Sequence, residues 1–101
     1  SNGVRRMDRE EIMLAEAAEN IPADVRSELE RYGFVPTLDA GNLWFYDKGN
    51  IRLCFGMDGF DYPQSLDAEC YAVEFIPAEH QFADEPFVEG TLRDVLDRIG
   101  I

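Results

Sequence analysis

The sequence predicts an α+β domain of two layers, in which N-terminal helices and a C-terminal helix pack on an antiparallel sheet of three to four strands. Apolar residues recur at helical spacing in the first third of the chain and again after Thr91. Between these stretches, apolar and polar residues alternate with the period of two that is typical of strands. The strands follow one another without an intervening helix, which favours antiparallel neighbours in one sheet.

Two helices are expected before residue 34, separated by a proline. Asp8 is placed to cap the first helix, with Glu11 in a capping-box position. Pro22 interrupts the helical pattern and suits the first turn of a second helix, because it has no backbone N–H to donate. Gly33 is placed to end that helix in a left-handed conformation. The apolar faces of the two helices comprise Leu14, Ala17, Ala18 and Ile21 in the first and Val25, Leu29 and Tyr32 in the second.

Residues 42–46 and 51–55 are typical of the two strands of a hairpin. A three-residue loop over 47–49, with Gly49 left-handed, places Phe45 opposite Ile51 and makes one face apolar throughout. A two-residue loop would place Phe45 opposite Arg52 and mix a charge into that face. We therefore expect the three-residue loop.

The other face of this hairpin is expected to carry aromatic residues together with charged ones. In the favoured register Trp44 lies opposite Arg52, which suits a cation–π pair. Two interpretations stay open for this face: a helix covers it as a second core layer, or it is an exposed surface for partner binding or for forming a homodimer. The residues concerned are Trp44, Tyr46, Arg52, Cys54 and Glu74.

The remaining elements follow from alternation and from capping residues. Residues 70–76 alternate as a third strand, after a loop over 56–69 that is rich in Gly, Pro and Asp. Residues 78–85 are expected to form a loop or a short helical turn, and a short edge strand follows at Phe87 and Val88. Residues 34–38 are expected to pair with the sheet as a further edge strand. Thr91 is placed to cap a final helix whose apolar face is Leu92, Val95, Leu96 and Ile99, with Gly100 at its end.

Composition limits the class of protein. The chain has 101 residues, a net charge of −12 and 46% hydrophobic residues, so it suits a single folded domain over residues 7–101. Residues 1–6 are interpreted as a disordered start that includes a remnant of an expression tag. We find no signal peptide and no apolar run of the ~20 residues that a transmembrane helix needs. The two cysteines, Cys54 and Cys70, are expected to be free thiols in a soluble cytoplasmic protein.

The negative charge is concentrated in one part of the chain. Residues 53–90 contain nine acidic residues and no Lys or Arg, which is three quarters of the net charge. This excess disfavours direct binding of nucleic acid and binding to membranes, because both are anionic. It favours a basic protein partner that docks on residues 58–89, although solvated acids that only keep the protein soluble remain the alternative. The candidate partner-binding residues are Asp58, Phe60, Asp61, Tyr62, Asp67, Glu69, Glu79, Phe82, Asp84 and Glu85.

Motifs for catalysis or for metal binding do not emerge. Asp58 and Glu69 have the spacing of the ends of an EF-hand loop, but Pro63 stands where that loop needs glycine. Cys54, Cys70 and His80 are too far apart in the sequence for a zinc motif. Pairing of Cys54 with His80 as a catalytic nucleophile has no supporting signature around either residue. We therefore expect no catalytic residue, no metal and no cofactor.

Charge, size and the lack of a catalytic motif together favour one function class. We expect a small acidic protein that is not an enzyme and that binds a basic protein, as an inhibitor or an immunity-type protein. Three alternatives stay open: a nucleic-acid mimic, an acidic secretion-type chaperone and a small-molecule enzyme. A chaperone would expose or dimerise through the Trp44 face, and an enzyme would have a pocket with a carboxylate or His80 of shifted pKa.

Overall fold

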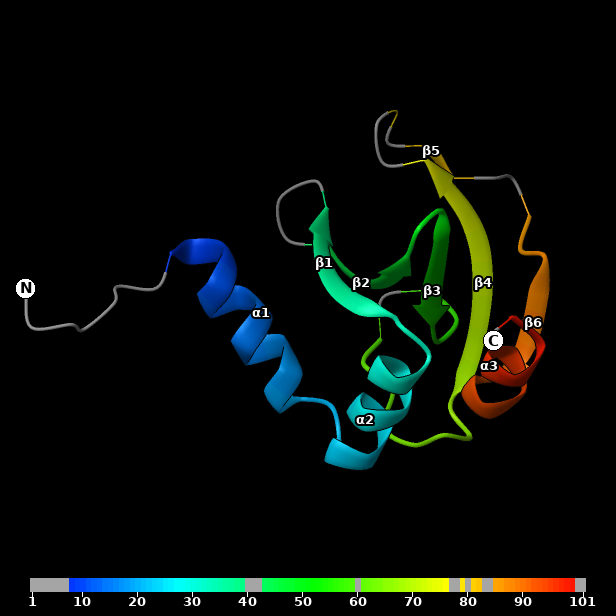
Figure 1. Cartoon of the computed structure of the whole chain (residues 1–101), viewed down its shortest axis with the longest axis horizontal. Helices are drawn as coiled ribbons and strands as arrows, with labels where there is room; N and C mark the ends of the chain where they lie inside the picture. Colours follow the sequence, from blue (N-terminus) through cyan, green and yellow to red (C-terminus); the bar gives the residue numbers. More distant parts are fainter. Residues whose placement is uncertain are drawn as a thin grey trace, which may run out of the picture.

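The computed structural model describes residues 8–39, 43–59, 61–76, 79, 81–82 and 85–99. As the sequence predicts, these residues form an α+β fold with helices before and after an antiparallel sheet (Figure 1). The helices are α1 (Arg9–Glu19), α2 (Ala23–Arg31) and α3 (Leu92–Ile99). The strands are β1 (Val35–Asp39), β2 (Leu43–Lys48), β3 (Ile51–Phe55), β4 (Glu69–Ile76), β5 (Gln81–Phe82) and β6 (Val88–Thr91).

The main sheet has five antiparallel strands in the order β1-β2-β3-β4-β6, so the expected number of three to four is too low. Both β3 and β6 pair with the first part of β4, on opposite edges, and the two-residue β5 pairs with the end of β4. The edge strand expected at Phe87 and Val88 is found in part as β6, which begins at Val88 and extends through a polar stretch to Thr91. Its residues do not alternate between apolar and polar, and it becomes a strand because the backbone of β4 offers a free edge.

The register of the β2–β3 hairpin differs from the expected one. Its turn is Gly49–Asn50, and Lys48 lies opposite Ile51, so β2 is longer than predicted. Gly49 does have the left-handed conformation that was expected, with φ of 58°. In this register Asp47 lies opposite Arg52, which gives each charge a partner. The expected register, which was chosen to pair apolar residues across the two strands, is therefore wrong. The pair formed by Asp47 and Arg52 is an ion pair and not an apolar pair.

Several element ends are confirmed. The Asp8 carboxylate accepts a hydrogen bond from the Glu11 backbone N–H (2.8 Å), and the Thr91 hydroxyl accepts one from the Asp94 N–H (3.1 Å). Gly33 ends α2 with φ of 89°. The expected strand near residues 34–38 is β1. Gly100 and half of residues 78–85 lie outside the described residues, and Gln81–Phe82 form β5 where a loop or a helical turn was expected.

The main core lies between the helices and one face of the sheet. Residues from all three helices, such as Ala17, Leu29 and Leu96, pack there against Leu53 and Phe55 of β3. A smaller group on the opposite face contains Phe45, Cys54 and Val73. The helices therefore cover one face, and the residues of the smaller group on the second face are also buried. Within the described ranges, none of the helices has the length and apolar character needed to cross a membrane.

Candidate protein-docking surface

The aromatic face that the sequence analysis expected is divided between the two faces of the sheet. Trp44 and Tyr46 point toward the helices, where they are 8% and 2% exposed. Glu74 lies on that same side but is exposed at the far end of β4. Arg52 and Cys54 lie on the opposite face. An odd shift in register sends every side chain of a strand to the other face, which explains the error.

Trp44 is thus part of the core and does not offer a binding or dimer face. Its ring makes edge-on contacts with Tyr46 and Tyr62, at centroid distances of 4.8 and 5.2 Å. Tyr62, a candidate docking residue, is 37% exposed because one side of it rests on Trp44. The expected cation–π pair between Trp44 and Arg52 is wrong, since the two side chains are on different faces.

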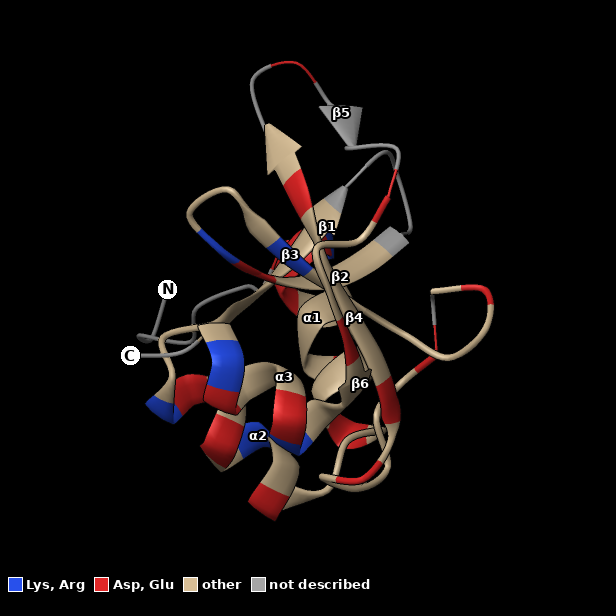
Figure 2. Cartoon of the chain, turned by 90° about the vertical axis from the view of Figure 1, so that its right-hand side faces the viewer, with Lys and Arg blue, Asp and Glu red and all other residues tan. Residues whose placement is uncertain are grey.

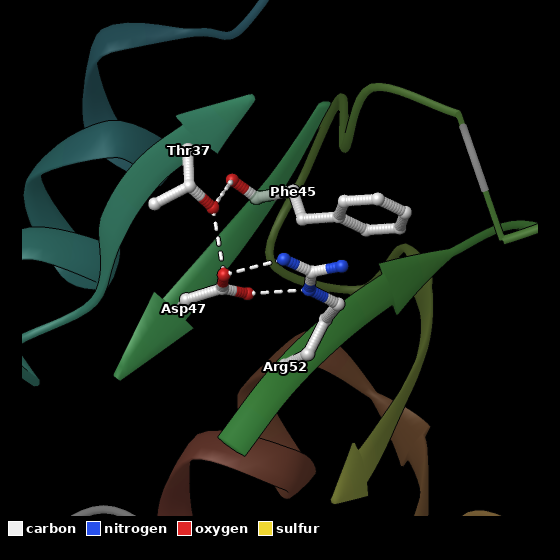
Figure 3. A network of polar contacts seen from close by, with 4 residues as sticks. All are labelled: Thr37, Phe45, Asp47 and Arg52. Carbon is white, nitrogen blue, oxygen red and sulfur yellow. Dashed lines mark hydrogen bonds and ion pairs between the residues drawn. The ribbon is translucent and has the colours of Figure 1, made fainter. Parts of the chain in front are cut away.

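Arg52 is held in a buried network on the face away from the helices (Figure 3). Its Nε and Nη2 donate hydrogen bonds to the two carboxylate oxygens of Asp47, at 2.8 and 2.7 Å. The Thr37 hydroxyl donates to the same carboxylate (2.7 Å), which links β1 to the hairpin. The guanidinium carbon lies 4.1 Å from the ring centroid of Phe45 and 3.5 Å from that of Phe75. With Arg52 only 2% exposed, this network stabilises the fold and is closed to a partner.

Among the candidate partner-binding residues, the acidic ones that the structure describes are all on the surface. They are Asp58, Asp61, Asp67, Glu69, Glu79 and Glu85. Phe60 and Asp84 lie outside the described residues, and so does the side chain of Phe82, whose backbone is in β5. Figure 2 shows acidic positions along the face that β4, β6 and α3 present to the viewer.

Two of these acids line a hollow with acids that the sequence analysis did not select. Asp67 and Glu69 are joined there by Glu89 of β6 and Asp94 of α3, around a space of about 570 Å³. Tyr71 and Thr91 also line it, and none of its described lining residues is Lys or Arg. We call this site, made by Asp67, Glu69, Tyr71, Glu89, Thr91 and Asp94, the acidic hollow. The expected docking segment, 58–89, contains Glu89 without singling it out, and Asp94 lies outside it, because their place beside Glu69 depends on the β4–β6 pairing and on the position of α3.

Strand pairing and backbone hydrogen bonds position the carboxylates. In the β4–β6 register Glu69 lies opposite Thr91, and Glu89 lies opposite Tyr71. The loop that carries Asp67 is tied to the start of α3 by two backbone hydrogen bonds of 2.9 Å, from Leu92 N–H to Ala68 O and from Arg93 N–H to Leu66 O. The backbone positions of these carboxylates are therefore set by strand pairing and by the hydrogen bonds between the loop and α3.

The loop after β3 packs beside the acidic hollow and carries Asp58 and Asp61. Gly56 and Gly59 have positive φ values of 76° and 84°. A Cβ at Gly59 would come within 2.5 Å of the Tyr71 hydroxyl, so glycine is required for the loop to approach this ring. Tyr71 thus contacts the loop and also lines the acidic hollow, which joins the two acidic regions of the candidate surface.

Two polar groups next to the loop, the Cys54 thiol and the Tyr71 phenol, are uncharged near neutral pH. Burial raises the pKa of the Cys54 thiol to about 11. Burial also raises the pKa of the Tyr71 phenol, and the nearby Cys54 raises it further. A protonated thiol is a poor nucleophile, so Cys54 has no activating environment in the described part of the chain. His80 is outside the described residues.

A second hollow of about 210 Å³, between α2 and α3, has a different character. It is lined by both Arg31 and Arg93, and by acids that include Glu28 and Asp97. Arg31 forms an ion pair with Glu28 at 3.0 Å, and the Tyr32 hydroxyl donates to Asp97 at 3.3 Å. Charges in this hollow are compensated within the chain, so the acidic hollow is the more distinctive of the two.

Among the described residues, no three His, Cys, Asp or Glu side chains lie close enough together to hold a metal ion. Comparison of the chain with models of known protein families, with curated proteins and with solved structures finds no match. We therefore infer a function from the chemistry of the surface.

Proposed function

We propose that this protein is a small acidic protein-binding module without enzymatic activity, of the inhibitor or immunity type, which docks a basic protein through residues 58–89. The observation that carries the proposal is the acidic hollow, where four carboxylates converge on one space whose described lining has no base. The exposed Asp58 and Asp61 extend the same negative surface along the neighbouring loop.

Electrostatics favours a basic partner for this arrangement. Glu69 and Glu89 are diagonal neighbours on adjacent strands of one sheet face, so their like charges repel each other. The ion pair of Asp67 with Arg93, at 3.6 Å, is open to solvent at both side chains and so compensates little of this charge. A cationic partner relieves the repulsion on binding and is also attracted from a distance.

Other features agree with a binding role in a reducing compartment. Cys54 and Cys70 are both buried thiols without a disulfide, which supports our proposal of a cytoplasmic protein. The raised pKa of Cys54 argues against nucleophilic catalysis by this residue. A secretion-type chaperone was expected to expose the Trp44 face or to dimerise through it. The burial of Trp44 in the main core argues against this alternative.

The test is affinity capture from a lysate of the source cells, with retained proteins identified by mass spectrometry. The first variant reverses Asp58, Asp61 and Asp67 to Lys. The matched control reverses three exposed acids of the helices, Glu16, Glu19 and Glu30, and so makes the same change in net charge. We expect the wild type and the control to retain the same basic protein, and the first variant to lose it. Equal retention by both variants, or no basic protein retained at low or moderate salt, contradicts the proposal.

A further inference from the structure

The β4–β6 part of the sheet has a face on which no described helix packs. Val88 of β6 and Ala72 of β4 belong to the core on the helix side. Because side chains alternate along a strand, Glu89 lies on the opposite side, together with Tyr71. Phe87 is 52% exposed, which is unusual for a phenylalanine beside a sheet. This face therefore presents aromatic surface next to the carboxylates of the acidic hollow.

We propose that the occupant of this face is an arginine-bearing extended segment of the basic partner, with a guanidinium against the Tyr71 ring and between Glu69 and Glu89. The proposal rests on the proposed function and names the chemistry that the partner presents. It assigns the aromatic ring and the two carboxylates to a single contact, whereas net charge alone would accept any cation.

Arginine suits this combination of groups better than lysine. A guanidinium is planar and stacks on an aromatic ring while its N–H groups donate to carboxylates at its edge. An ammonium group is a more strongly hydrated point charge and gives up its water less readily. The register places Tyr71 directly opposite Glu89, so a ring and a carboxylate are neighbours across the strands. Phe87, which precedes Val88, offers a second aromatic surface to the aliphatic part of the same segment.

The protein itself contains the same chemistry elsewhere in this sheet. The guanidinium of Arg52 lies between the rings of Phe45 and Phe75 and is paired with both oxygens of Asp47. There the arginine belongs to the chain and is buried. At the acidic hollow the ring and the carboxylates are present, and the described residues that line it contribute no arginine.

The experiment is an NMR titration of the whole chain, labelled with ¹⁵N. The probes are a short peptide in which arginine alternates with serine, the same peptide with lysine, and the same peptide with glutamate. We expect the arginine peptide to shift the amide signals of Glu69, Tyr71, Glu89 and Thr91. We also expect it to bind about threefold more tightly than the lysine peptide, because of the cation–π contact. The glutamate peptide should cause no shifts.

Two matched variants locate the contact. Glu89→Gln removes one carboxylate beside Tyr71 and should weaken binding of the arginine peptide about two- to fivefold. Glu74→Gln removes an exposed carboxylate from the helix side of the same strand β4 and should leave binding unchanged. Phe87→Ala should also weaken binding, and an unchanged spectrum away from the site would show that the variant is folded.

The outcomes distinguish this inference from the proposed function. Equal binding of the arginine and lysine peptides, or amide shifts confined to other parts of the chain, overturns the inference. If the basic protein is still captured and charge reversal still abolishes capture, the proposed function stands without it. Loss of the arginine preference in Glu89→Gln, with the preference kept in Glu74→Gln, supports the inference.

Discussion

Arg52 shows how a single residue organises the face of the sheet away from the helices. Its charge is buried, yet it is compensated by Asp47 and by two aromatic rings. Bringing both charges out of water is costly, and the hydrogen bonds and close geometry offset that cost. The pair also joins three strands, because Thr37 of β1 donates to the same carboxylate.

Replacing Arg52 by Met should lower the free energy of unfolding by about 3–5 kcal/mol, because Asp47 then keeps a buried charge without its guanidinium. Urea unfolding measures this change. The double variant Arg52→Met, Asp47→Leu should recover part of the loss, since it removes the second charge as well. A double variant that is less stable than the single one would show that the ion pair is not the main contribution.

Buried ionisable side chains, among them Cys54, Cys70 and Tyr46, should make stability fall at alkaline pH, because burial raises the pKa of each. Burial raises the pKa of Cys54 from 9.0 to about 11 and that of Tyr46 from 10.0 to about 12. Their contribution is fully present below the pKa of the unfolded chain, and it is lost as pH rises toward the folded values. We expect the unfolding free energy to decrease from pH 9 upward, and to decrease less steeply in Cys54→Ala. An equal slope in wild type and variant would refute this assignment.

At the scale of elements, helices were easier to predict than strand pairing. Capping at Asp8 and Thr91 and the left-handed Gly33 are local, so the sequence indicates them directly. The hairpin register depends on a pair, Asp47 with Arg52, that forms only when the two strands meet. The apolar pattern alone supported a different register, because both faces of these strands carry aromatic residues.

The packing of helix α3 on the main core should contribute to the stability of the whole domain. Leu96 is 1% exposed and packs with the core under the sheet, so Leu96→Ala should cost about 2–5 kcal/mol of unfolding free energy. The fluorescence of Trp44, the one tryptophan of the chain, reports core unfolding. Arg98→Ala, on the exposed side of the same helix, is the control and should change stability by about 0.5 kcal/mol or less. Similar small effects of both changes would place α3 outside the core.

For the whole molecule, the arrangement of layers separates stability from the proposed binding role. The helices cover one face of the sheet, and the acidic hollow lies where Glu69 and Glu89 of the opposite face meet Asp94 of α3. Its carboxylates are exposed and so lie outside the main core. A partner can be recognised there without disturbing the packing of the helices.

The net charge of −12 predicts that added salt stabilises the free protein. Repulsion among the carboxylates opposes the compact state, and salt screens it. We expect the unfolding temperature to rise from low to moderate NaCl concentration. Each acid-to-Lys reversal changes the charge by two units, so the triple variant of Asp58, Asp61 and Asp67 carries −6 instead of −12. Its unfolding temperature should rise less with salt, and a rise as large as that of the wild type would mean that these acids do not contribute to the repulsion.

The sequence by itself determined the fold class, the helices and their caps, the strands β3 and β4, and the segment that holds most of the charge. These follow from periodicity, capping and composition, which act between residues close in the chain. Only the tertiary structure decided the hairpin register, the burial of Trp44 and the meeting of Asp67 and Glu69 with Glu89 and Asp94. The physical reason is that these depend on contacts between distant residues, above all the pairing of β6 with the free edge of β4.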